Sequence, residues 1–79
     1  MDDTQELARC EALAEKAWSQ MYEAAPHNVK DYYEDASLYI AQALQIARKL
    51  GLKDESVRLA ARGAHYDAVF NSQFRYAGR

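Results

Sequence analysis

Residues 26–51 read PHNVKDYYEDASLYIAQALQIARKLG, and this stretch decides the fold. It begins at the only proline of the chain and ends at a glycine that follows two cations, Arg48 and Lys49. Proline disfavours helical backbone at the preceding residue, and a glycine after a cationic turn is typical of a helix C-terminus. Apolar residues between these two points recur in steps of four and three, the spacing of one helix face. The stretch predicts a helix over 29–50 with the apolar stripe Val29, Tyr33, Ala36, Ile40, Ala43, Ala47 and Leu50.

Working outwards, the same pattern predicts one helix before this stretch and one after it, at 4–24 and 55–76. Asp3, Asn28 and Asp54 stand where N-terminal capping residues are expected. Both connections are short, so consecutive helices should be antiparallel, and the helix over 29–50 should lie in the middle because its apolar face is the widest. The predicted fold is an all-α, antiparallel three-helix domain formed by residues 1–79. The flanking apolar stripes are Leu7, Cys10, Ala14, Ala17, Trp18, Met21, Ala24 and Ala25 in the first helix, and Leu59, Gly63, Tyr66, Phe70, Phe74 and Ala77 in the third.

Composition supports this fold and excludes other classes. The 79 residues suit one domain, and a hydrophobic content of 49% is too high for a disordered chain. Alanine occurs 15 times and Val, Ile and Thr together only six, which argues against a β-rich fold. No apolar run reaches the roughly 18 residues of a membrane span. The acidic start, Met1 to Asp3, argues against a signal peptide, and the single cysteine, Cys10, favours a cytoplasmic location.

The net charge of −2 conceals a strong asymmetry along the chain. Residues 1–36 hold nine acids and three bases, a net −6, whereas residues 37–79 hold three acids and seven bases, a net +4. Among the acids, Glu11, Glu15 and Glu23 are predicted on the outer face of the first helix. The asymmetry favours head-to-tail self-association or binding of an acidic partner.

The bases of the third helix gather on one side of it. They share that side with a valine, a serine and a tyrosine at steps of four and three, which predicts a contact face for another protein. A solvated helix face is the equally weighted alternative. The predicted partner-binding residues are Arg58, Arg62, His65, Val69, Ser72 and Tyr76.

Few residues suggest catalysis or metal binding. Asp67 is predicted at the edge of the core, where a carboxylate needs a partner such as an arginine or a tyrosine hydroxyl. The functional alternative is a reactive acid in a pocket. Cys10 is predicted as a buried small hydrophobe, and neither histidine has a Ser or Cys at triad spacing. We therefore expect no enzyme activity, no metal and no cofactor.

Residues 36–70 resemble a tetratricopeptide-type helical hairpin. Ala36, Ile40 and Ala43 follow the small-large-small spacing of the second helix of that repeat, and Leu59, Gly63 and Tyr66 match a following first helix. The chain departs from the repeat where Arg62 replaces the usual leucine and where the closing proline is missing. The resemblance implies protein or peptide binding and no catalysis.

The predicted function is non-catalytic protein binding by a small adaptor, inhibitor or accessory subunit, with an acidic surface on the partner. Leu38, on the outer side of the second helix, is a candidate for a homodimer seam. One alternative is a phage or mobile-element inhibitor of host defence, of the anti-CRISPR type. A nucleic-acid-binding helical module is less favoured, because the acidic half of the chain would repel phosphates.

Overall fold

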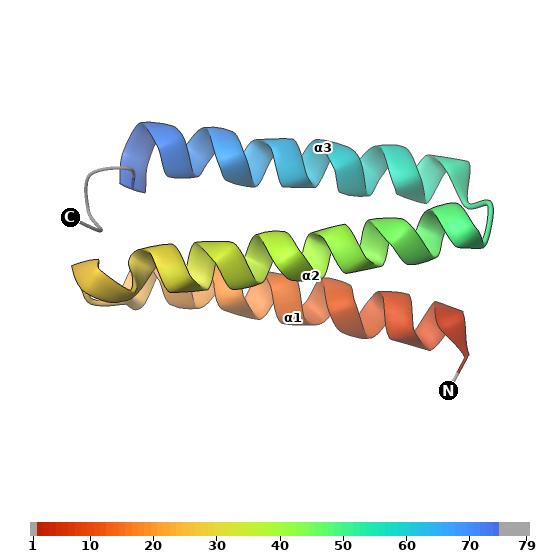
Figure 1. Ribbon diagram of the computed structural model, residues 1–79, viewed down its shortest axis with the longest axis horizontal. Helices are drawn as coiled ribbons and strands as arrows, with labels where there is room; N and C mark the ends of the chain where they lie inside the picture. Colours follow the sequence, from red (N-terminus) through yellow and green to blue (C-terminus); the bar gives the residue numbers. More distant parts are fainter. Residues whose placement is uncertain (1, 75–79) are drawn as a thin grey trace.

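The chain folds into antiparallel α-helices, as the sequence predicts. The computed structural model describes residues 2–74, with α1 at Asp3–Glu23, α2 at Val29–Lys49 and α3 at Lys53–Val69 (Figure 1). A 3₁₀ turn, η1 (Pro26–Asn28), leads into α2, and a π-helical turn, η2 (Phe70–Phe74), continues α3. Over the same residues, no helix combines the length and the apolar character needed to cross a membrane.

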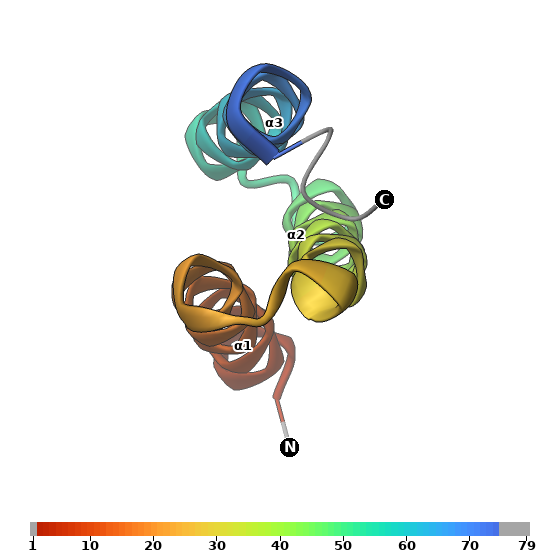
Figure 2. The same ribbon diagram turned by 90° about the vertical axis from the view of Figure 1, so that its left-hand side faces the viewer.

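The helix α2 lies in the middle, which confirms the expectation from its wide apolar face. Viewed along the helices, α1 and α3 flank α2 as the two arms of an open V (Figure 2). The backbones of α1 and α3 do not pack closely on each other. Long side chains join them instead, so a shallow space remains between the two arms.

The core is built mainly from small side chains. Buried alanines on α1 and α2 let the two backbones approach closely, and larger residues fill the remaining space. Two predicted stripe residues of α2 are not buried: Tyr33 is half-buried at the α3 edge, and Leu50 is 39% exposed beside the turn. The buried apolar residues are Leu7, Cys10, Ala14, Ala17, Met21, Val29, Ala36, Ile40, Ala43, Ala47, Leu59 and Tyr66.

The glycine that ends α2 adopts the conformation predicted for it. Gly51 has φ +73°, a left-handed conformation that side chains other than glycine rarely adopt. Leu52 N–H donates to the carbonyl of Ala47 at 2.9 Å, and Gly51 N–H donates to that of Arg48 at 3.1 Å. These two bonds form a Schellman motif, which turns the chain sharply enough for α3 to return along α2.

The predicted capping residues are wrong for α1 and α3. The side chain of Asp2, not Asp3, accepts a hydrogen bond from Gln5 N–H at 2.9 Å and caps α1. Asn28 is the N-cap residue of α2, as predicted, but its side chain makes no capping hydrogen bond. The start of α3 is Lys53, so Asp54 lies inside its first turn, where its charge favours the helix dipole. The predicted end of the third helix at residue 76 lies outside the described residues.

Candidate functional site

Three of the residues predicted to bind a partner, Arg58, Arg62 and His65, lie on the side of α3 next to α1. The two arginines among them reach carboxylates of α1, and the histidine lines a hollow between α1 and α3. Val69 is partly buried and Ser72 is exposed, whereas Tyr76 lies outside the described residues. The predicted set was Arg58, Arg62, His65, Val69, Ser72 and Tyr76.

Glu11 of α1 holds both arginines of α3. Arg58 donates hydrogen bonds to both Glu11 carboxylate oxygens and a further one to Glu55 of its own helix. Arg62 Nη1 donates to Glu11 Oε1 at 3.2 Å. The hydrogen bond from Arg58 holds the pKa of the Glu11 carboxyl below its ordinary value, and burial opposes this shift only in part. The same carboxylates raise the pKa of Arg58.

The basic face predicted on α3 is therefore largely neutralised within the chain. In addition to the bonds with Glu11, Arg62 Nη2 lies 2.9 Å from Glu15 Oε1. The expectation that Glu11 and Glu15 line the outer face of the first helix is wrong, because α3 returns along the side of α1 that carries them. Glu23, at the end of α1, is exposed as expected.

Acidification is expected to weaken the fold through Glu11. The lowered pKa of Glu11 in the folded state means that its stabilisation is complete above the ordinary value of 4.5 and is lost as the pH falls through the lowered pKa. At neutral pH, Glu11→Gln should lower the free energy of unfolding by only about 1 kcal/mol, because the Arg58 side chain is 45% exposed and solvent screens the pair.

Urea denaturation of both proteins at a series of pH values checks this. The stability difference between wild type and Glu11→Gln should shrink between about pH 5 and about pH 3. A difference that stays constant over this interval would show that the charge of Glu11 plays no part.

A shallow groove of about 330 Å³ lies between α1 and α3. Trp18 of α1 stacks on Tyr66 of α3 with ring centroids 4.1 Å apart and planes 15° apart. Tyr66 is buried, Trp18 is partly exposed, and the side chains of Ser19 and His65 stand in solvent beside them. The site thus combines an aromatic pair with an acidic and a basic side chain, Glu15 and Arg62. We call it the α1–α3 groove, and it is lined by Glu15, Trp18, Ser19, Arg62, His65 and Tyr66.

The aromatic contacts continue along the same side of the molecule. Tyr22 meets Trp18 edge to face at 5.9 Å and Phe74 of η2 in the same manner at 5.0 Å. Tyr22 is 54% exposed, so this row of rings is accessible to solvent on the side of α1. Such exposed aromatic groups are typical of binding surfaces.

Only Arg62 and His65 of this groove were predicted from the sequence as binding residues. Trp18 and Tyr66 were predicted in the core, since each belongs to an apolar stripe, and Glu15 was predicted on an outer face. Ser19 carried no signal at all. The missing information was the angle at which α3 crosses α2, because that angle decides which residues of α1 and α3 meet.

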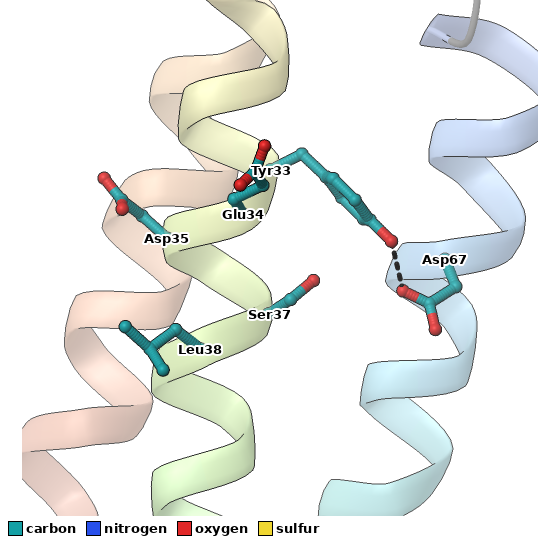
Figure 3. Close-up of a pocket in the computed structure, with 6 residues that line it drawn as sticks. All are labelled: Tyr33, Glu34, Asp35, Ser37, Leu38 and Asp67. Carbon is teal, nitrogen blue, oxygen red and sulfur yellow. Dashed lines mark hydrogen bonds between the residues drawn. The ribbon is translucent and has the colours of Figure 1, made fainter.

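Asp67 has the kind of partner that the sequence predicts. Tyr33 Oη of α2 donates to Asp67 Oδ1 of α3 at 2.6 Å (Figure 3). The ring of Tyr33 stacks on Phe70, with centroids 3.9 Å apart. The hydrogen bond to Asp67 raises the pKa of the Tyr33 hydroxyl, and burial adds to the shift. Asp67 lies at the edge of the core, as predicted, and its side chain is exposed.

The hollow beside this bond offers no catalytic constellation that we can identify. It is an open space of about 560 Å³ rimmed by the carboxylates of Glu34, Asp35 and Asp67. Among residues 2–74, no group of three or more Cys, His, Asp or Glu side chains is arranged to hold a metal ion. Cys10 is buried, and burial raises the pKa of its thiol, which favours the protonated form over the nucleophilic thiolate.

Comparison of the chain with known protein families, curated proteins and solved structures found no match. The resemblance to a tetratricopeptide hairpin stays a prediction as a result. Function has to be inferred from the geometry of the α1–α3 groove.

Proposed function

We propose that the chain is a non-catalytic protein-interaction module that binds a segment of another protein in the α1–α3 groove. The observation that carries this proposal is the Trp18–Tyr66 stack, which is partly open to solvent between two helices and has Arg62 at its rim. Aromatic rings and arginine contribute most of the affinity in protein interfaces, because they bury large surfaces and still satisfy polar groups.

The electrostatics of the rim favour an acidic segment on the partner. The Glu15 side chain is 56% exposed and pairs with Arg62 through Nη2 alone, so it is readily displaced. A carboxylate of the partner would take its place on Nη2, while Glu11 keeps Arg62 Nη1 paired. Binding of an acidic segment would therefore leave no charged side chain buried without a partner.

The same ion pairs make nucleic acid a weaker alternative. A nucleic acid carries a phosphate on every nucleotide and needs several free cations, whereas Arg58 is already held by Glu11 and Glu55 and only Arg62 can exchange a carboxylate for a ligand. An inhibitor of host defence would be one form of the favoured proposal, since it too acts by binding another protein.

Trp18 provides the test, because it is the only tryptophan in the chain and lies in the groove. Short acidic peptides that carry one aromatic residue should change its fluorescence on binding, whereas basic peptides and duplex DNA should not. We expect His65→Glu, which adds a negative charge beside the stack, to weaken peptide binding by about tenfold. The matched control is Gln20→Glu, which makes the same charge change at an exposed site of α1 outside the groove.

Equal affinity of the acidic peptides for the His65→Glu and Gln20→Glu proteins would remove this groove as the binding site. A response to DNA and none to peptides would favour the nucleic-acid alternative.

A further inference from the structure

A second apolar surface, on α2 and α3, has no partner within residues 2–74. Among the 17 residues of α3, only Leu59 and Tyr66 are buried, compared with five buried residues in α1 and five in α2. The outer face of α3 is uncharged and exposed over several turns. Its residues are Val57, Ala60, Ala61, Ala64 and Ala68.

This face leads into an apolar groove of about 370 Å³ between the two helices. Ala41 and Leu44 of α2 form one wall, and Ala60 and Ala64 of α3 form the other. Gly63 adds depth because it has no side chain: a Cβ there would come within 3.5 Å of Ile40. We call this space the α2–α3 groove, and its small residues would let another helix approach closely.

Large apolar side chains project from the same surface into solvent. Val57 is 64% exposed at the N-terminal end of α3, and Leu38 is 53% exposed on α2. A hollow lined by small residues next to projecting apolar side chains is a self-complementary shape. The projecting side chains of one copy can enter the hollow of a second copy, and the reverse contact forms at the same time.

Charges of opposite sign stand at the two ends of this surface. Glu34 of α2 and Asp67 of α3 lie at one end, because the N-terminal part of α2 is next to the C-terminal part of α3. Arg48 of α2 and Lys53 of α3 flank the Gly51 turn at the other end. Two acids, Asp54 and Glu55, follow Lys53, and Glu55 is paired with Arg58. Glu34, Asp67, Arg48 and Lys53 are all exposed.

We propose that a second copy of the chain binds this surface, so that two α3 helices lie antiparallel across each other's α2–α3 grooves. With a two-fold axis near Ala60, a residue that precedes Ala60 in one copy lies next to the residue that follows Ala60 by the same number of positions in the other copy. Lys53 of each copy then meets Asp67 of the other, and Val57 enters the groove at Gly63. In this arrangement the acidic end of each copy lies next to the basic end of the other copy.

The pattern of charge favours a second copy over a helix of another protein. A partner helix of uniform charge would be attracted at one end of the groove and repelled at the other. A second copy of the same surface, placed antiparallel to the first, puts opposite charges next to each other at both ends of the groove. The α2–α3 groove shares no lining residue with the α1–α3 groove, so this dimer is independent of the proposed binding function.

Sedimentation equilibrium over a range of concentrations tests the dimer. The wild-type protein should pass from the mass of one chain to twice that mass as its concentration rises. Ala64→Arg, which fills the groove with a charged side chain, should raise the dimer dissociation constant at least about tenfold. Ala12→Arg, at an exposed alanine of α1, is the matched control and should dimerise like wild type.

An exchange of charges tests the antiparallel arrangement. Lys53→Asp and Asp67→Lys should each weaken the dimer about tenfold, because each places like charges opposite one another. The double variant restores both pairs without changing the composition, and it should recover most of the affinity. Circular dichroism shows whether Asp67→Lys, which loses the bond from Tyr33, still folds. If it does not, Lys53→Asp and Ala64→Arg still decide the proposal.

A chain that stays monomeric up to about 1 mM refutes the second copy and leaves the groove to a helix of another protein. Dimers that form equally well with Ala64→Arg place the interface elsewhere and also refute it. A folded double variant that fails to recover refutes the antiparallel arrangement.

Discussion

Leu59→Ala is expected to lower the free energy of unfolding by about 2–5 kcal/mol, the range for a leucine removed from a packed core. Leu59 has no solvent-exposed surface and is one of only two buried residues of α3. Its loss leaves a cavity against α2 and removes the main apolar anchor of α3. Because domains of this size have a small margin of stability, we expect α3 to detach from α2 or the whole chain to unfold.

Denaturation followed by circular dichroism and by Trp18 fluorescence measures this effect. Trp18 stacks on α3, so its emission should move towards that of exposed tryptophan when α3 detaches. Leu38→Ala is the matched control, since it removes the same atoms from a side chain that is 53% exposed, and its cost should stay within about 1 kcal/mol. Equal shifts of the denaturation midpoint in the two variants would mean that Leu59 does not anchor α3.

Trp18→Ala is expected to have the next largest effect, about 2–4 kcal/mol, somewhat below the full range for a buried tryptophan because Trp18 is partly exposed. The substitution removes the stack on Tyr66 and the edge contact with Tyr22. These rings, together with the arginine pairs, are what connects α1 to α3, since the two backbones lie apart. Loss of the ring should therefore loosen α3 and open the α1–α3 groove.

Thermal unfolding of Trp18→Ala and Trp18→Phe provides the measurement. Phenylalanine keeps an aromatic face for Tyr66 and should retain most of the stability, because offset-stacked rings contribute about 0.5–1.5 kcal/mol beyond their buried area. If both variants lose the same stability, the stack is not the contact that matters. Because Trp18→Phe has no tryptophan, its peptide binding is measured by isothermal titration calorimetry, and a loss of binding without a loss of stability would support the binding role of the groove.

The local features of the fold were predictable because they depend on neighbouring residues. The Schellman turn at Gly51 follows from a glycine after a cationic helix end. The buried stripe of α1 and the central place of α2 follow from apolar spacing. Capping residues were mistaken by one or two positions, because several acids and amides near each helix start can accept the same hydrogen bond.

The candidate site was predictable only in part, because it needs two helices at once. Arg62 and His65 stand out on α3 from sequence spacing, yet their neighbours Trp18 and Ser19 are distant in the chain. Asp67 shows the same limit: its need for a partner follows from chemistry, but the choice of Tyr33 depends on how α3 lies along α2.

By itself, the sequence determined the three α-helices found in residues 2–74, their order, the turn at Gly51 and the separation of negative from positive charge along the chain. Tertiary structure alone decided where those charges meet. Glu11 and Glu15 of the acidic half pair with Arg58 and Arg62 of the basic half inside the chain. The physical reason is that the spacing of residues along a helix determines which of them share a face, whereas the packing of the helices determines what that face contacts.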